Sequence, residues 1–143
     1  MATLFTRILK GELPGRFVWR DEHCGAFLTI APIRPGHLLV VPHAEVDHWL
    51  ELDPELAQHL TGVAQTLGKA IRHGFPCKKV GLMIAGLEVP HVHLHVLPID
   101  RLQDMDFANQ DENARPEDLD AAASTIRASL RALGLDACAQ AIS

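Results

Sequence analysis

The chain lacks the features that mark proteins of membranes and nucleic acids. None of its 143 residues belong to an apolar run long enough to cross a bilayer. The N-terminus has no extended apolar centre of the kind found in signal peptides. The formal net charge is −5, and no cluster of basic residues could follow a phosphate backbone. We therefore expect a cytoplasmic protein without a membrane or nucleic-acid partner.

Cysteine is scarce, and no internal repeat or second domain is visible. The three cysteines, Cys24, Cys77 and Cys138, are too far apart in the sequence for a disulfide framework or a metal knuckle. Reduced thiols in a reducing compartment fit this pattern. A chain of this length is sufficient for one domain with a substantial core, so we expect a single domain over residues 1–143.

One short stretch stands out against this background. His91, His93 and His95 alternate with aliphatic residues in the segment 91–97, HVHLHVL. Strict alternation predicts a half-buried strand whose side chains point in turn to its two faces. The three imidazoles should share one face, and Val92, Leu94 and Val96 the other. The aliphatic face is the one to bury, so the imidazoles should face solvent, a phosphate, a metal or a cleft.

Three interpretations of these histidines remain open at this point. Neighbouring rings on one strand face lie about 6.5–7 Å apart, given a rise of about 3.3 Å per residue. Two or three of them could bind a transition metal. Alternatively, one ring could act as nucleophile or general base while its neighbours orient it or bind charge on a substrate. The third interpretation is a solvated strand that carries histidines without chemistry.

The rest of the chain predicts helices and an antiparallel sheet. A short helix is expected over 3–10 with Leu4, Ile8 and Leu9 turned inward, a long one from Asp53 to Gly74, and a last one from Pro116. Strands are expected at 17–20, 26–30, 36–41, 80–85 and the histidine stretch. The segment 100–115 is polar, apart from the apolar interruption 105–108, which should pack back on the body. His43, His48, His59 and His73 are interpreted as surface or capping residues, and 138–143 as a frayed end. Together these elements indicate an α+β fold with a sheet of about five strands.

The histidine stretch resembles the signature of the histidine triad family of nucleotide hydrolases and transferases. All seven positions of 91–97 fit the pattern His-φ-His-φ-His-φ-φ, where φ is apolar. The stretches 5–14, 26–32 and 35–42 resemble the family's N-terminal element and its two following strands. The resemblance covers about residues 4–100, and it leaves a polar loop and a C-terminal helix in 101–143. It implies the family's fold and, commonly, a homodimer.

The resemblance also implies roles for individual residues. His93 would attack the α-phosphorus of a purine nucleotide, and His95 would hold a phosphate oxygen, with His91 and His37 as the remaining active-site histidines. The substrate would be a nucleoside phosphoramidate, an aminoacyl adenylate or a dinucleoside polyphosphate, cleaved through a nucleotidyl-histidine without a cofactor. The expected nucleotide-binding residues are Leu4, Phe5, Ile8, Phe27, Thr29, Ile30, Glu88 and Val89.

Several positions depart from the family pattern. Thr3 and Thr6 stand where many members have two zinc-binding cysteines, and Glu45 stands where they have a histidine, so we expect no structural zinc. Thr29 replaces the acidic residue that binds ribose. The stretch before the triad is shortened and contains Glu88, which would repel a phosphate or receive an amine. Two alternatives to the enzyme are a non-catalytic nucleotide-binding regulatory protein and a metalloenzyme with a three-histidine site.

Overall fold

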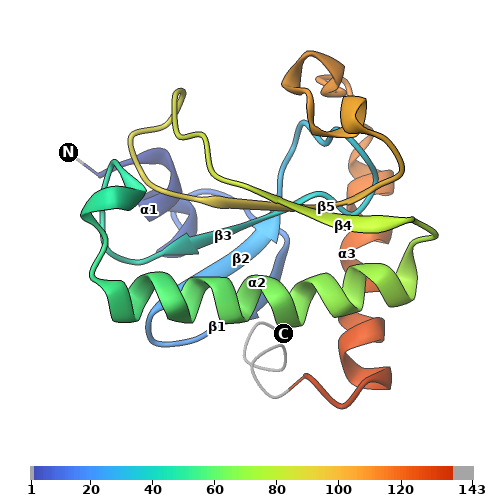
Figure 1. The fold of residues 1–143 in the computed structure, drawn as a ribbon, viewed down its shortest axis with the longest axis horizontal. Coiled ribbons are helices and arrows are strands. Elements are labelled where there is room, and N and C mark those ends of the chain that lie inside the picture. Colours follow the sequence, from blue (N-terminus) through green and yellow to red (C-terminus); the bar gives the residue numbers. More distant parts are fainter. Residues whose placement is uncertain (1, 137–143) are drawn as a thin grey trace.

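A computed structural model describes residues 2–136, which form one antiparallel sheet flanked by helices (Figure 1). The sheet has the strand order β1-β2-β3-β5-β4. The strands are β1 (Phe17–Arg20), β2 (Cys24–Leu28), β3 (Leu38–Pro42), β4 (Lys79–Met83) and β5 (Leu94–Ile99). The helices are α1 (Leu4–Leu9), α2 (Pro54–Gly74) and α3 (Pro116–Ala132), with 3₁₀ turns η1 (Trp49–Glu51), η2 (Leu102–Met105) and η3 (Phe107–Asn109). The α+β class and the five strands are thus confirmed.

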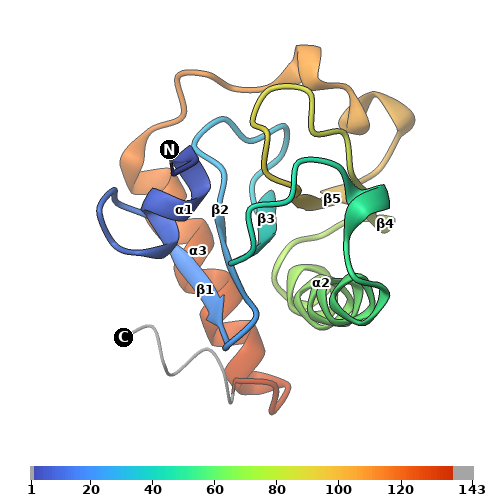
Figure 2. The same ribbon diagram turned by 90° about the vertical axis from the view of Figure 1, so that its left-hand side faces the viewer.

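The helices cover opposite faces of this sheet. Figure 2 shows α1 on one side of the strands and α2 on the other. The larger core lies on the α2 side and includes Ala26, Leu28, Val92, Leu94 and Val96, together with buried side chains of α2 and α3. A smaller core on the α1 side is built from Phe5, Leu9, Phe17, Phe27, Leu39 and Val41. The predicted alternation in the histidine stretch is therefore correct, since Val92, Leu94 and Val96 all enter the larger core.

Helix α2 forms where the sequence predicted it. The Asp53 carboxylate accepts a hydrogen bond from the backbone N–H of Glu55 at 3.0 Å, and Pro54 occupies the first turn. Leu60, Val63, Leu67 and Ile71 recur at helical spacing and are buried against the sheet. The helix thus begins at its predicted cap and packs through its predicted face.

The limits of the histidine strand differ from the prediction. The ladder of β5 begins at Leu94 rather than His91, and it continues through Pro98 to Ile99. Residues 91–93 are held outside the sheet instead, because the N–H of Val92 donates to the carbonyl of Val46 at 2.7 Å and that of His91 to Val89. The first triad residue is therefore anchored to a neighbouring segment instead of a strand.

Smaller boundary shifts occur in β2 and β3, and each of these two has a local cause. β2 starts two residues early because the Asp21 carboxylate accepts the N–H groups of His23 and Cys24 and closes the turn there. β3 starts at Leu38 because the N–H of His37 is used in a turn to Arg34. In α1, Leu9 is buried as predicted, but Leu4 is 49% exposed and does not turn inward.

The polar segment 100–115 folds back over one end of the sheet. The buried Asp104 carboxylate accepts hydrogen bonds from Arg34 Nη1 and from the N–H of Asp100, each at 2.8 Å. This ion pair fixes η2 and η3, so that Phe107 packs against the ring of His95 as the apolar interruption predicted. The segment, expected to be a loop, thereby becomes one wall of the cavity described below.

None of the helices within residues 2–136 combines the length and the apolar composition needed to cross a membrane. The frayed end expected at 138–143 lies outside the described residues.

Candidate functional site

A cavity of about 590 Å³ opens on the α1 side of the sheet. His93 and His95 line it, and so do all eight residues predicted to bind the nucleotide, among which Ile30 lies on the rim with 75% of its surface exposed. His37 and His91 do not line the cavity, and both are fully buried behind it. The residues singled out in the sequence therefore form two layers, one that a ligand can reach and one that supports it.

His93 presents a free ring nitrogen to this cavity. Its Nδ1 lies 2.8 Å from the backbone carbonyl of His91, which can only accept, so Nδ1 carries the proton. Nε2 is then unprotonated and has a lone pair. Phe5 packs edge-on against the ring with centroids 4.8 Å apart and restricts its rotation. The backbone of the triad itself thus sets the tautomer that a nucleophile needs.

A chain of hydrogen bonds fixes His95 in the other tautomer, with the proton on Nε2. The N–H of Ile33 donates to His37 Nδ1 at 3.1 Å, which places the proton of His37 on Nε2. That Nε2–H donates to His95 Nδ1 at 2.9 Å. The proton of His95 therefore lies on its Nε2, and this nitrogen is a donor. The cavity is consequently lined by one imidazole that can attack and one that can donate a hydrogen bond.

His91 supports the cluster from behind. Its Nε2–H donates to the carbonyl of Pro42 at 2.7 Å, so Nδ1 accepts the hydroxyl proton of Thr3 at 2.6 Å. The N–H of Thr3 in turn donates to the Glu45 carboxylate at 2.8 Å, and the Thr6 hydroxyl also binds this carboxylate. The three positions that depart from the family's zinc ligands thus meet around His91 in a hydrogen-bond network.

The electrostatics keep these four imidazoles neutral. Burial, together with the neighbouring imidazoles, lowers the pKa of His95 to about 3 and that of His37 to about 4. Burial also lowers the pKa of His93, although its hydrogen bond to the His91 carbonyl opposes this, and it lowers the pKa of His91 in the same way. At neutral pH the cavity therefore holds uncharged rings, one with a free lone pair.

The geometry does not support a three-histidine metal site. Within residues 2–136, the ring nitrogens of the triad do not converge within 4.8 Å of one another as ligands of one ion would. Instead, nitrogens of His91 and His93 are committed to backbone carbonyls, and Nδ1 of His95 is committed to His37. The arrangement is suited to nucleophilic attack and hydrogen bonding rather than to metal binding.

Several cavity residues were missed in the sequence. Phe107 lies with its ring centroid 4.9 Å from that of His95, and Gln110 and Glu112 follow it along the rim. Arg16 lines the opposite side and pairs with Asp120 at 2.7 Å. The apolar interruption at 105–108 was the only signal for this wall, and it indicated packing rather than a site.

Comparisons with known proteins agree with this geometry. The family model described as HIT domain matches residues 10–102. An uncharacterised HIT-like protein of Methanocaldococcus jannaschii is 38% identical over 99 residues, which cover 66% of this chain and 77% of that protein.

Two solved structures share the fold over most of both chains. One is a HIT-like protein of Bartonella henselae, described as involved in cell-cycle regulation, with a TM-score of 0.77 and 26% identity over 90% of this chain and 96% of that one. The other is a zinc-bound histidine triad family protein of Mycobacterium smegmatis, with a TM-score of 0.78 and 27% identity over 94% and 96%. With the domain match and the triad geometry, these likenesses show that the chain belongs to the histidine triad (HIT) family.

Proposed function

We propose that this protein cleaves the bond between the α-phosphorus of a purine nucleotide and its leaving group through a nucleotidyl-His93 intermediate. The observation that carries the proposal is the hydrogen bond from His93 Nδ1–H to the His91 carbonyl, since it leaves Nε2 free to attack. His95 Nε2–H lines the same cavity and supplies a donor to a phosphate oxygen where negative charge develops.

The reaction divides into two displacements. In the first, the lone pair of His93 Nε2 forms a bond to phosphorus while the bond to the leaving group breaks, and the leaving group takes the electron pair; a carboxylate leaves as the anion, and an amine takes up a proton from solvent. In the second, a water oxygen attacks phosphorus and the water loses one proton to solvent, the P–N bond breaks, and a nucleoside monophosphate leaves as Nε2 regains its lone pair. Because the rings start neutral, no proton must be removed before the first attack.

Charges at the cavity rim favour one kind of leaving group. Glu88 and Glu112 both line the cavity and are exposed. Carboxylates repel a second phosphate chain and attract an ammonium group. We therefore favour nucleoside phosphoramidates and aminoacyl adenylates over dinucleoside polyphosphates as substrates.

A leaving-group panel tests the function directly. Adenosine and guanosine monophosphates joined to an amine, an aminoacyl group or a second nucleotide are incubated with the protein, and release of monophosphate is measured with and without chelator. We expect release from the amine or aminoacyl derivatives, unaffected by chelator. Tight binding without release would favour the regulatory alternative, and activity lost to chelator and restored by a metal would favour the metalloenzyme.

The pH dependence should follow from the lowered pKa of His93. Protonation of this ring removes the nucleophile, so activity falls as pH drops through its pKa. Since burial places that pKa below the usual 6.5, the neutral ring persists to lower pH. We expect kcat/KM with a good substrate to be flat from about pH 8 to about 6.5 and to fall only below that. An acid limb with an apparent pKa at or above 6.5 would contradict the buried neutral nucleophile.

Because of Thr29, the enzyme should discriminate poorly between ribonucleotides and 2′-deoxyribonucleotides. Thr29 lines the cavity, and its Oγ1 already accepts the N–H of Ala31 at 3.2 Å, so the hydroxyl has one proton to offer. A carboxylate accepts from both ribose hydroxyls, and charged hydrogen bonds contribute about 1.5–3 kcal/mol against about 0.5–1.5 for neutral ones. The difference of about 1 kcal/mol is about fivefold in rate. We expect little discrimination against 2′-deoxynucleotides, and Thr29→Asp should increase it about fivefold, as matched turnover assays would measure.

A hundredfold preference of the wild type for ribose would contradict this expectation. It would mean that another residue binds the sugar.

We also propose that the protein is a homodimer that pairs through β4. This strand lies at the edge of the sheet, where its outer N–H and C=O groups can pair with the same strand of a second copy. Leu82 on this strand is 50% exposed. Light scattering after gel filtration should give twice the chain mass for the wild type and a lower mass for Leu82→Glu. Leu102→Glu, at an exposed leucine on η2, is the matched control and should leave the mass unchanged. A monomeric wild type would refute the proposal.

A further inference from the structure

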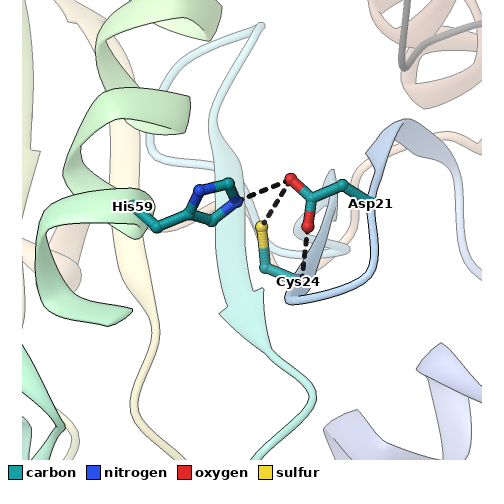
Figure 3. Close-up of side chains that lie close together, drawn as sticks. All are labelled: Asp21, Cys24 and His59. Carbon is teal, nitrogen blue, oxygen red and sulfur yellow. Dashed lines mark hydrogen bonds and ion pairs between the residues drawn. The ribbon is translucent and has the colours of Figure 1, made fainter. Parts of the chain in front are cut away.

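A second group of metal-binding side chains lies away from the catalytic cavity. Asp21 is in the turn between β1 and β2, Cys24 begins β2, and His59 is in the first half of α2 (Figure 3). One carboxylate oxygen, the thiol sulfur and one imidazole nitrogen lie within 4.8 Å of one another. Cys24 is fully buried in the larger core, so the group is on the opposite side of the sheet from the triad.

The distances suit one cation of small radius. Asp21 Oδ2 lies 3.6 Å from Cys24 Sγ and 2.7 Å from His59 Nε2. Ligand atoms around tetrahedral zinc, with bonds of about 2.0–2.3 Å, are separated by roughly 3.3–3.8 Å. The oxygen–sulfur distance already has this value, and the oxygen–nitrogen distance needs to open by only about 0.6 Å. The His59 side chain is 36% exposed, which gives it room for that movement.

The backbone holds the group ready for a ligand. Asp21 Oδ1 accepts the N–H groups of His23 and Cys24, each at 2.8 Å, so the carboxylate cannot rotate away. Cys24 is paired with Pro42 in the β2–β3 ladder. The carboxylate and the thiol are therefore fixed by the sheet, while His59 reaches them from the helix that packs on it.

Two protons now occupy the place that a cation would take. His59 Nε2–H and Cys24 Sγ–H both donate to the same Asp21 oxygen, Oδ2. The three potential ligand atoms are a nitrogen, an oxygen and a sulfur. Such a mixed set suits the borderline-soft ions of the first transition row. Such an ion replaces both protons with a single positive centre held by the same three atoms.

We propose that Asp21, Cys24 and His59 bind a divalent first-row transition metal ion of the Zn²⁺ type, with water as the fourth ligand. The proposal is independent of the proposed catalytic function. On binding, the Cys24 thiol loses its proton to solvent, and the His59 ring binds the ion through Nε2 with its proton on Nδ1. The bound ion ties the β1–β2 turn to α2.

Cobalt is the probe, because a thiolate ligand gives Co²⁺ an intense sulfur-to-metal charge-transfer band that imidazoles alone cannot give. The full chain carries Cys77→Ser and Cys138→Ser, so Cys24 is its only thiol. We expect one Co²⁺ per chain and the charge-transfer band. In a Trp49→Phe background, we also expect quenching of Trp19, whose Nε1 lies 2.9 Å from Asp21 Oδ2.

Two substitutions separate metal binding from a purely structural hydrogen-bond cluster. Cys24→Ser should abolish the band. His59→Gln retains an N–H donor for Asp21 but not an imidazole ligand, and it should weaken Co²⁺ binding by more than about tenfold. His73→Gln, at an exposed histidine on the same helix, is the control and should bind as the wild type does. Circular dichroism confirms that each variant is folded.

Two results would overturn the proposal. One is Co²⁺ binding without the charge-transfer band in the chain that retains only Cys24. The other is unchanged Co²⁺ affinity in folded His59→Gln, which would leave the group as a hydrogen-bond cluster only. In the wild type, Tm should rise with the logarithm of the Zn²⁺ concentration once that concentration exceeds the dissociation constant. This rise should be lost in His59→Gln.

Discussion

Replacing His93 by alanine should lower the rate of nucleotide cleavage by at least about 10³-fold, since the substitution removes the only group proposed to form a bond to phosphorus. Binding should survive. Most of the cavity lining is apolar side chain that this substitution leaves in place, for example Leu4, Ile8 and Phe27. We therefore expect the dissociation constant of a nucleoside monophosphate to change by less than about tenfold, which is about 1.4 kcal/mol.

Rapid quenching and mass spectrometry provide the direct measurement. The wild type should yield a peptide containing His93 with one nucleoside monophosphate attached, and His93→Ala should yield none. His48→Ala, at an exposed histidine that caps η1, is the matched control and should retain the wild-type rate. A His93→Ala rate within a few-fold of the wild type would refute the assignment of the nucleophile.

The sequence predicted the parts of this site that depend on local periodicity. Alternation along a strand is a property of neighbouring residues, so the separation of His93 and His95 from Leu94 and Val96 could be inferred correctly. The tautomers could not be inferred. The tautomer of His93 depends on where the carbonyl of His91 lies after folding. The tautomer of His95 depends on the N–H of Ile33, which acts through His37, and both of these residues are distant from His95 in the sequence.

The missed cavity wall has a different cause. Phe107, Gln110 and Glu112 follow the stretch that resembles the family, and they lie in a polar segment without helical or strand periodicity. The segment reaches the cavity because the ion pair between Arg34 and Asp104 pins it there. Such a long-range contact leaves no pattern in the sequence on either side.

The cluster of Asp21, Cys24 and His59 shows the same limit more sharply. The spacing rules for cysteine detect ligands that are near neighbours along the chain, and Cys24 has no cysteine near it in the sequence. His59 was interpreted as a surface residue, yet its Nε2 lies 2.7 Å from the Asp21 carboxylate. Only the packing of α2 against the sheet brings residue 59 to residues 21 and 24.

His37→Leu should reduce kcat by about 10²-fold or more without contact between residue 37 and the substrate. His37 is a positioning residue, because its Nε2–H fixes the proton of His95 on the nitrogen that faces the cavity. Without this donor, His95 can adopt the other tautomer and present a lone pair to the phosphate oxygen. Loss of one preorganised donor to a developing anion costs about 10²–10³-fold in kcat.

The conservative variant His37→Gln distinguishes this role from simple packing. Glutamine retains an N–H at the end of a side chain of similar reach, so it should restore part of the lost kcat, while leucine fills the buried volume without any donor. KM should change by no more than a few-fold in either variant, since the residues that line the cavity are unchanged. Nitrogen NMR of the His95 ring supplies the second measurement: the proton should reside on Nε2 in the wild type and in His37→Gln, and should distribute over both nitrogens in His37→Leu. Equal kcat values for folded leucine and glutamine variants would show that His37 only fills space, and the donor assigned to His95 would then have to be set by another group.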